Sequence, residues 1–243
     1  MLRLRPNGAL TSDTLYRKRQ IVSVKVKICG VTTPDIVEAA ASAGADFVGL
    51  VFFPRSPRNV DLETARVLRE AARGKIGTVA VMVDPDDGLV DNVGEEVRPD
   101  LLQLHGSETP ERVAEIKART GLPVMKAIGV AIPSDIGAAS RYTKIADYIL
   151  FDAKPDAGTI LPGGNAQAFD WTMLTEATMP FALSGGLTPT NVSDAVRMTG
   201  AFLVDVSSGV ERAPGKKDGA LVRQFIQAAK DAASSEKSRA KAS

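Results

Sequence analysis

Residues 24–52, VKVKICGVTTPDIVEAAASAGADFVGLVF, contain two runs of β-type residues on either side of a helix-type segment. The helix-type segment opens with Thr-Thr-Pro, as an N-cap and a first-turn proline would, and it closes on Gly44. A strand, a helix and a second strand within about 30 residues form a βαβ unit, in which the two strands run parallel. This stretch therefore predicts a parallel sheet covered by helices.

The same alternation continues along the rest of the chain. β-type runs recur at intervals of about 20 to 30 residues, the length of one strand-plus-helix unit. The eight runs are VKVKIC (24–29), DFVGLVF (46–52), GTVAVMV (77–83), DLLQLH (100–105), PVMKAIGV (123–130), DYILFD (147–152), FALSGG (181–186) and FLVDVSS (202–208). The intervening segments SETPERVAEIKARTG and TPTNVSDAVRMTG repeat the helix pattern and end at Gly121 and Gly200.

Eight such units in 243 residues predict an α/β fold, a single (β/α)8 TIM barrel. A doubly wound open sheet is the main alternative, but no GxGxxG motif follows the first run. We expect the catalytic barrel to occupy residues 23–234. The polar residues 1–22 predict a disordered extension, and residues 235–243 predict a mobile polar tail.

Composition excludes several classes of function. Lysine and arginine total 30 against 29 aspartate and glutamate, so the net charge is +1 and favours neither nucleic acid nor an anionic membrane surface. No run reaches the roughly 18 apolar residues of a membrane span. The N-terminal segment has no apolar stretch typical of a secretory signal, although an organelle transit peptide is an alternative. With a single cysteine, the chain is expected to be cytoplasmic.

Strand parity indicates which side chains face the inside of the barrel. Side chains alternate along a strand, so the apolar set at positions 24, 26 and 28 should face the helices, which leaves Lys27 and Cys29 pointing inward. The same rule places further polar side chains inside: Gln103, His105, Asp152, Asp205 and Ser207. Each of them alone could be structural, but several together at the C-terminal ends of the strands predict an active site.

Two loops rich in glycine and serine suggest the ligand. SGGL (184–187) follows the seventh run and SSGVE (207–211) follows the eighth, where TIM barrels commonly bind phosphate. We expect the phosphate of a small-molecule substrate at Gly185, Gly186, Ser207 and Ser208, with His105 and Asp205 also contacting that substrate.

A basic loop follows the second run. FFPRSPRNV contains Arg55 and Arg58 beside prolines that stiffen the chain. The loop is either a solvated turn or a guanidinium fork for a second anionic group such as a carboxylate.

These segments, in this order, resemble the phosphoribosylanthranilate isomerase family of the tryptophan pathway, from about residue 26 to residue 229. The segments that carry the resemblance are KICGVT, GLVFFPRSPR, LLQLHGSE, FDAKP…GGNAQAFDW, LSGGL and VDVSSGVE…PGKKD. One departure is that the sixth run reads Phe-Asp-Ala, where the family commonly has Leu-Asp-Thr or Leu-Asp-Ser.

The resemblance implies an enzyme for the third committed step of tryptophan biosynthesis. That step is the Amadori rearrangement of N-(5′-phosphoribosyl)anthranilate to 1-(2-carboxyphenylamino)-1-deoxyribulose 5-phosphate, without metal or cofactor. It further implies that Cys29 is the general base, that Asp152 is the general acid, and that Arg58 holds the anthranilate carboxylate. The enzyme would be a monomer or a homodimer.

Burial raises the pKa of a thiol, so a buried thiol ionises near neutral pH only if a neighbouring cation stabilises the thiolate. Lys27 precedes Cys29 by two residues on the same inward face, and the first and eighth strands adjoin when a barrel closes. We therefore expect Lys27 and Asp205 to form a buried pair that favours the Cys29 thiolate. A purely structural pair is the alternative.

Other functions stay open at this point. A metal-dependent ribulose-phosphate epimerase needs paired histidines, and this chain has one. Indole-glycerol-phosphate synthase and the aminoaldose-phosphate isomerase of histidine biosynthesis are further phosphosugar enzymes to consider. A non-catalytic phosphate-binding barrel would need the two loops but neither Cys29 nor Asp152.

Overall fold

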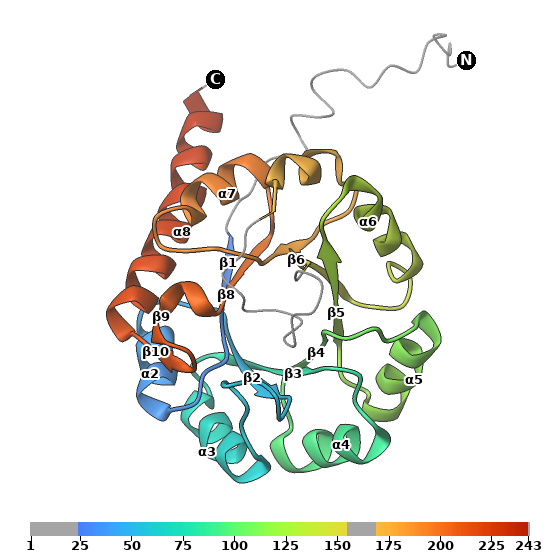
Figure 1. Ribbon diagram of the computed structural model, residues 1–243. Coiled ribbons are helices and arrows are strands. Elements are labelled where there is room, and N and C mark those ends of the chain that lie inside the picture. Colours follow the sequence, from blue (N-terminus) through green and yellow to red (C-terminus); the bar gives the residue numbers. More distant parts are fainter. Residues whose placement is uncertain (1–23, 155–168, 243) are drawn as a thin grey trace, which may run out of the picture.

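The computed structural model describes residues 24–154 and 169–242. Eight parallel strands close into one barrel in the order β1 to β8 (Figure 1). The strands are β1 (Lys25–Cys29), β2 (Phe47–Phe52), β3 (Gly77–Met82), β4 (Leu101–Leu104), β5 (Val124–Val130), β6 (Tyr148–Ala153), β7 (Ala182–Leu183) and β8 (Leu203–Val206). The predicted (β/α)8 fold is confirmed, and each strand overlaps one of the eight predicted runs.

Helices form a ring outside the strands (Figure 1). The α-helices are α2 (Pro34–Ser42), α3 (Leu62–Ala72), α4 (Asp87–Asn92), α5 (Pro110–Thr120), α6 (Pro133–Gly137), α7 (Val192–Thr199) and α8 (Gly219–Ala242). Shorter turns of helix are η1 (Val93–Val97), η2 (Ala138–Arg141), η3 (Trp171–Glu176) and η4 (Ser208–Val210). A small hairpin, β9 (Glu211–Ala213) and β10 (Lys216–Lys217), follows β8.

The helix boundaries follow the expected local signals. Proline occupies the first turn of α2 and of α5, and the Thr109 side chain accepts a hydrogen bond from the Arg112 N–H at the start of α5. Helices α5 and α7 end at Gly121 and Gly200, with φ of 65° and 68°. Glycine adopts this left-handed conformation without a steric penalty, so it ends both helices where the sequence predicts.

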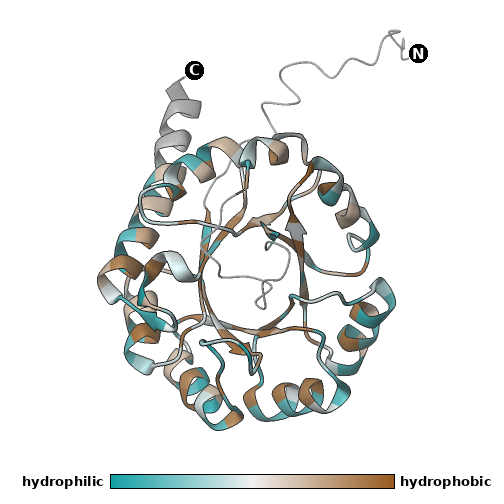
Figure 2. Ribbon diagram, viewed as in Figure 1, coloured by the Kyte–Doolittle hydropathy of each residue, from teal (hydrophilic) through white to brown (hydrophobic). Residues whose placement is uncertain are grey.

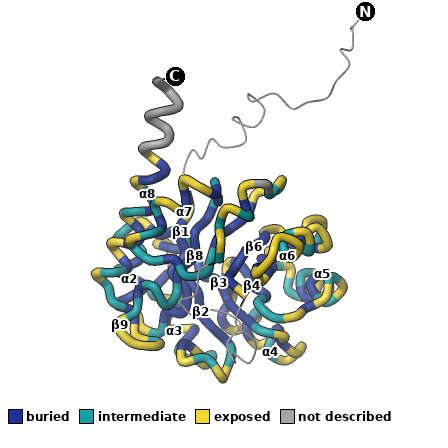
Figure 3. The backbone as a smooth tube through the Cα atoms, turned by 45° about the horizontal axis from the view of Figure 1, so that its top comes forward, coloured by how far each residue is buried: buried dark blue, intermediate teal, exposed yellow. Residues whose placement is uncertain are grey.

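The core has two parts, one between strands and helices and one inside the barrel. The outer part includes Val26 and Ile28, and the inner part includes Cys29, as the parity argument predicts. The other members of the inner cluster are Val51, Val79, Val81, Leu101, Met125, Ala127, Leu150, Ala182 and Leu203. Figure 2 shows apolar residues along the strands and polar residues on the outer faces of the helices, and Figure 3 shows the strands buried.

The structure describes the C-terminal end of the chain up to residue 242 but not its N-terminal end. Residues 1–22 lie outside the described residues. Helix α8 continues to Ala242, so most of the predicted polar tail is helical, while its mobility stays a prediction. In the part of the chain that is described, no helix is long and apolar enough to cross a membrane.

A buried ion pair fixes the loop after β4. Lys126 Nζ lies 2.9 Å from Glu108 Oε2 and also donates to the Gly106 carbonyl at 2.8 Å. Glu108 Oε1 in turn accepts from the backbone N–H of Asp84 at 2.9 Å, which belongs to the loop after β3. The side chains of Lys126 and Glu108 are 3% and 1% exposed. This pair therefore holds the loop that begins at His105 against the ends of β3 and β5.

We expect Lys126→Met to lower the free energy of unfolding by about 3–5 kcal/mol, because it leaves the Glu108 charge buried without its partner. The double variant Lys126→Met/Glu108→Gln should recover part of that loss. Urea unfolding followed by circular dichroism measures both. The matched control is Lys75→Met, which breaks the exposed pair between Lys75 and Glu38 and should cost less than about 1 kcal/mol. Equal losses at the buried and the exposed pair would contradict this assignment.

Candidate active site

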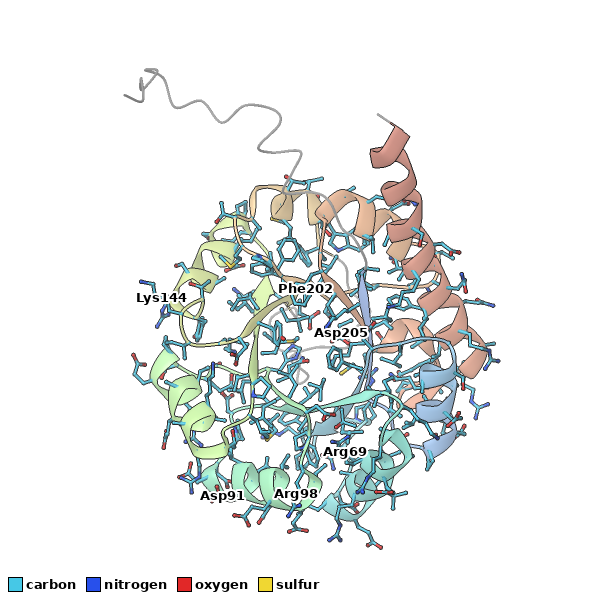
Figure 4. All side chains as sticks on the ribbon, turned by 180° about the vertical axis from the view of Figure 1, so that it is seen from behind. Arg69, Asp91, Arg98, Lys144, Phe202 and Asp205 are labelled. Carbon is cyan, nitrogen blue, oxygen red and sulfur yellow. The ribbon has the colours of Figure 1, made fainter. Side chains whose placement is uncertain are left out.

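Polar side chains from four strands gather inside the barrel at the C-terminal ends of the strands. Cys29 ends β1, His105 follows β4, Asp152 lies near the end of β6, and Asp205 lies on β8. Figure 4 shows Asp205 and Phe202 near the centre of the barrel, with four other labelled side chains on the outer ring: Arg69, Asp91, Arg98 and Lys144. The structure therefore brings together the side chains that parity predicts to point inward.

Lys27 and Asp205 form the expected ion pair where β1 meets β8. The two residues are direct register partners, and Lys27 Nζ donates to Asp205 Oδ2 at 2.9 Å. Their side chains are 0% and 4% exposed. Burial acts to lower the pKa of Lys27, but the charges of Asp205 and Cys29 outweigh it and raise that pKa. Lys27 is therefore a buried cation at the site.

The Cys29 thiol is buried and its pKa lies above the ordinary value. Burial is the largest cause of the rise. The charge of Lys27 acts in the opposite direction, followed by Asp205, which raises the pKa, and Lys217, which lowers it. Lys27 thus favours the thiolate, as expected, but only offsets part of the effect of burial.

Asp152 is held from two sides. Its Oδ1 accepts from the Ala153 N–H at 2.9 Å, and its Oδ2 lies 3.1 Å from His105 Nε2. His105 Nδ1 lies 2.9 Å from Gln103 Nε2. These contacts make a continuous polar chain from β4 to β6 through side chains that parity places inside the barrel.

Arg58 already has a carboxylate partner within the protein. Its guanidinium binds Glu211 through two hydrogen bonds of 2.8 Å each, a bidentate arrangement. Both side chains are nearly buried, at 6% and 4% exposed. The interpretation of this segment as a solvated turn is therefore wrong for Arg58, whereas its contact with a substrate stays a prediction.

Glu211 and Lys217 are buried residues that sequence analysis did not assign. Lys217 Nζ donates to Glu211 Oε1 at 2.7 Å and to the Ser207 carbonyl at 3.0 Å. Ser207 Oγ donates to the Cys29 carbonyl at 3.2 Å. Burial lowers the pKa of Lys217, and Glu211 opposes that effect. This charged cluster connects Arg58, the loop after β8 and the backbone of the thiol-bearing strand.

The two loops expected to bind phosphate lie next to the site. Gly185 has φ of 93°, and a Cβ there would lie 2.6 Å from the Ala153 N, so only glycine lets this turn approach the end of β6. A Cβ on Gly209 would overlap the Leu187 carbonyl oxygen, so the loops after β7 and β8 are in close contact. Gly186, Ser207 and Ser208 belong to the same pair of loops.

Buried side-chain nitrogen and oxygen atoms without a hydrogen-bond partner are few in the described chain. They are Gln103 Oε1, Asp205 Oδ1 and Trp171 Nε1. Two of the three belong to the interior of the barrel, where an unsatisfied acceptor is costly unless a ligand supplies the donor. Within residues 24–154 and 169–242, no group of three or more His, Cys, Asp or Glu side chains is placed to hold a metal ion.

The fold and the site together define a TIM-barrel enzyme with a buried thiol and a carboxyl group at its catalytic rim. The family model described as N-(5′-phosphoribosyl)anthranilate (PRA) isomerase matches residues 26–228. The chain therefore belongs to the N-(5′-phosphoribosyl)anthranilate isomerase family.

Individual relatives agree with this membership. An N-(5′-phosphoribosyl)anthranilate isomerase from Paramagnetospirillum magneticum is 56% identical over 209 residues, which cover 85% of this chain and 97% of the relative. One from Rhodopseudomonas palustris strain BisA53 is 56% identical over 207 residues, which cover 84% of this chain and 95% of the relative. The crystal structure of phosphoribosyl anthranilate isomerase from Thermotoga maritima is 36% identical with a TM-score of 0.77, covering 86% of this chain and 99% of that one.

We expect Lys27→Met to raise the pKa of Cys29, because it removes the nearest stabilising cation. Titration of the ultraviolet thiolate absorbance measures this directly, since Cys29 is the chain's one cysteine. The control is Lys27→Met/Asp205→Asn, which avoids an unpaired buried carboxylate. Its Cys29 pKa should lie between those of the wild type and the single variant, because Asp205 itself raises that pKa. A folded single variant with an unmoved titration would defeat the expectation.

Proposed function

We propose that this protein converts N-(5′-phosphoribosyl)anthranilate to 1-(2-carboxyphenylamino)-1-deoxyribulose 5-phosphate, with Asp152 as general acid and Cys29 as general base. The observation that carries the proposal is that one rim of the barrel holds two groups able to transfer protons. These are the buried Cys29 thiol near the Lys27 ammonium group and the Asp152 carboxyl group within hydrogen-bond distance of the His105 imidazole. An Amadori rearrangement needs one group to donate a proton and another to accept one. Family membership supports the same reaction.

Ring opening is the first task. Protonated Asp152 donates its proton to the furanose ring oxygen as the C1′–O bond breaks, and the anthranilate nitrogen supplies the electrons that form an iminium ion. Asp152 becomes a carboxylate in this step. The Ala153 N–H and His105 lie against its two oxygens and can stabilise the charge that forms.

Removal of the C2′ proton is the second task. The Cys29 thiolate takes this proton, and the released electron pair forms the C1′–C2′ double bond and neutralises the iminium nitrogen. The resulting enolamine tautomerises to the ketone. Because Asp152 has lost one proton and Cys29 has gained one, transfer of one proton between them, directly or through solvent, restores the starting state.

The substrate would be held at both ends. Arg58, oriented by Glu211, would contact the anthranilate carboxylate from the loop after β2. The loops containing Gly185, Gly186, Ser207 and Ser208 would bind the phosphate through backbone N–H groups and hydroxyls. A related isomerase, 35% identical with a TM-score of 0.75, has been crystallised with reduced 1-(o-carboxyphenylamino)-1-deoxyribulose 5-phosphate. That ligand carries both anionic groups.

One buried acceptor inside the barrel suits the sugar. Asp205 Oδ1 has no partner although it is buried, and a ribose hydroxyl can donate a hydrogen bond to it. We assign Asp205 this contact in addition to its ion pair with Lys27. His105 was expected to contact the substrate as well, and that contact stays a prediction.

Placement in the cell and oligomeric state are separate matters. Three statements stay predictions from the sequence: that the protein is cytoplasmic, that it uses no metal or cofactor, and that it is a monomer or a homodimer. A structure of monomers generated from the dimeric phosphoribosylanthranilate isomerase of Thermotoga maritima is 36% identical with a TM-score of 0.74, so that parent enzyme is a dimer. This favours the homodimer here.

Other phosphosugar chemistries are separable by experiment. Indole-glycerol-phosphate synthase would release CO2, and a histidine-pathway aminoaldose-phosphate isomerase would accept a different aminoaldose phosphate. A non-catalytic barrel would bind sugar phosphates with no turnover. An assay that follows the loss of phosphoribosylanthranilate fluorescence tests the proposal, and no turnover by the folded wild type would refute it.

Cys29→Ala and Asp152→Asn should each lower kcat by about 10²- to 10⁴-fold, the usual contribution of a general acid or base. Circular dichroism and urea unfolding should show that both variants remain folded. The control is Ser42→Ala on the exposed face of α2, which should leave kcat unchanged. If either variant at the rim keeps a near-normal kcat, its role has been assigned wrongly.

Inorganic phosphate and sulfate should inhibit competitively, because each would occupy the phosphate position between the loops after β7 and β8. Sodium chloride at the same ionic strength is the control, and it should inhibit less because it only screens charge. A crystal soaked in sulfate should show the anion between these loops. Anion density elsewhere on the rim, or noncompetitive inhibition, would contradict the placement.

A further inference from the structure

His105 is the only histidine in the chain, and both of its ring nitrogens have a protein partner. Nδ1 lies 2.9 Å from Gln103 Nε2, and Nε2 lies 3.1 Å from Asp152 Oδ2. The imidazole therefore sits between a neutral amide on β4 and the carboxyl group that we assign as the acid on β6.

The surroundings of His105 hold this geometry in place. Gln103 is fully buried on β4, at 0% exposed. The His105 backbone N–H donates to the Met82 carbonyl at 2.8 Å, which anchors the residue to β3. The residues that follow are held by the buried pair of Glu108 and Lys126. The ring is thus fixed by its backbone and by both of its nitrogens.

The two contacts determine where the imidazole proton resides. A neutral imidazole has one donor nitrogen and one acceptor nitrogen. Because the Gln103 amide NH2 donates to Nδ1, the proton must be on Nε2, which then donates to Asp152 Oδ2. An amide that offered its oxygen to Nδ1 would give the opposite tautomer, with a bare Nε2 facing the carboxyl group.

We propose that Gln103 is a positioning residue that holds His105 in the Nε2–H tautomer, so that His105 orients the acid without accepting its proton. This inference rests on the proposed function for the role of Asp152. A bare Nε2 would compete with the substrate for the proton of Asp152, whereas an Nε2 that already carries hydrogen cannot accept it.

The tautomer also orients the carboxyl group. Nε2–H donates to Oδ2 and the Ala153 N–H donates to Oδ1, so both oxygens are held and the plane of the group is fixed. Charged groups on other strands face the same space, because Asp205 on β8 interacts electrostatically with Asp152 and is paired with Lys27 on β1. The remaining lone pairs of Asp152 are left to carry the proton toward the substrate.

Nitrogen NMR of the full-length wild-type protein, labelled with ¹⁵N-histidine, tests the tautomer directly. The spectrum contains one imidazole because the chain has one histidine. At mildly alkaline pH we expect a protonated Nε2 and a bare Nδ1. A protonated Nδ1 with a bare Nε2, a mixture of tautomers, or a doubly protonated ring would each overturn the proposal.

Substitutions at position 103 test the effect on activity. Gln103→Met keeps a similar volume but has no donor, so the tautomer preference should be lost and kcat should fall by about tenfold, with a smaller change in KM. Gln103→Glu presents an acceptor to Nδ1 and should force a proton onto that nitrogen, with a larger loss of roughly 10²-fold or more. Gln227→Met on the exposed face of α8 is the matched control and should alter neither tautomer nor kcat.

The outcomes separate this inference from the proposed function. The tautomer is read without substrate, so a wild type that has the Nε2–H form but no isomerase activity refutes only the proposed function. A folded Gln103→Met protein that keeps both the tautomer and kcat refutes only the role of Gln103. If the variants at position 103 do not fold, the wild-type spectrum still decides the tautomer.

Discussion

The structure depends on one constraint, which is that side chains alternate between the inside and the outside along each strand of a closed parallel barrel. Each strand sends every second side chain inward, and the interior must be filled by those side chains alone. Here apolar residues such as Leu101 and Met125 fill part of that interior. Lys27, Gln103, Asp152 and Asp205 are also buried, and a buried polar group needs a partner. Lys27 pairs with Asp205, and His105 contacts both Gln103 and Asp152. The polar site is therefore a second layer of the same packed interior.

The sequence predicts the fold well because its signals are local. Runs of β-type residues, first-turn prolines and terminal glycines each act within a few positions, and all eight strands overlap the predicted runs. Strand ends are less well determined. The run FALSGG predicts a strand over 181–186, but β7 is only Ala182–Leu183, since the following glycines leave the sheet with positive φ. The residue at which a strand ends depends on which residues of the neighbouring strands pair with it, and a local sequence pattern does not contain that information.

Parity also predicts much of the site, including Cys29, His105, Asp152 and the pairing of Lys27 with Asp205. It could not identify Glu211 as the partner of Arg58, because the two residues are separated by 153 positions. Arg58 lies in a loop and Glu211 begins the short strand β9 outside the barrel, so the parity of the barrel strands does not apply to either residue. The pair of Glu108 and Lys126 went unassigned because Glu108 lies in the loop after β4, although Lys126 lies on β5. Tertiary packing sets such partners, so the inward-facing residues of the barrel strands were easier to place than the charged residues that support them.

The pairing across β1 and β8 has a consequence for the newly made chain. Lys27 and Asp205 are 178 residues apart, so the first strand leaves the ribosome long before its partner. At about 5–20 residues per second, that interval is on the order of 10 s. Until β8 has been synthesised, the Cys29 thiol is exposed to solvent, has an ordinary pKa of about 8.5, and can react with oxidants and other electrophiles. Completion of the barrel converts a vulnerable nascent cysteine into a sheltered one.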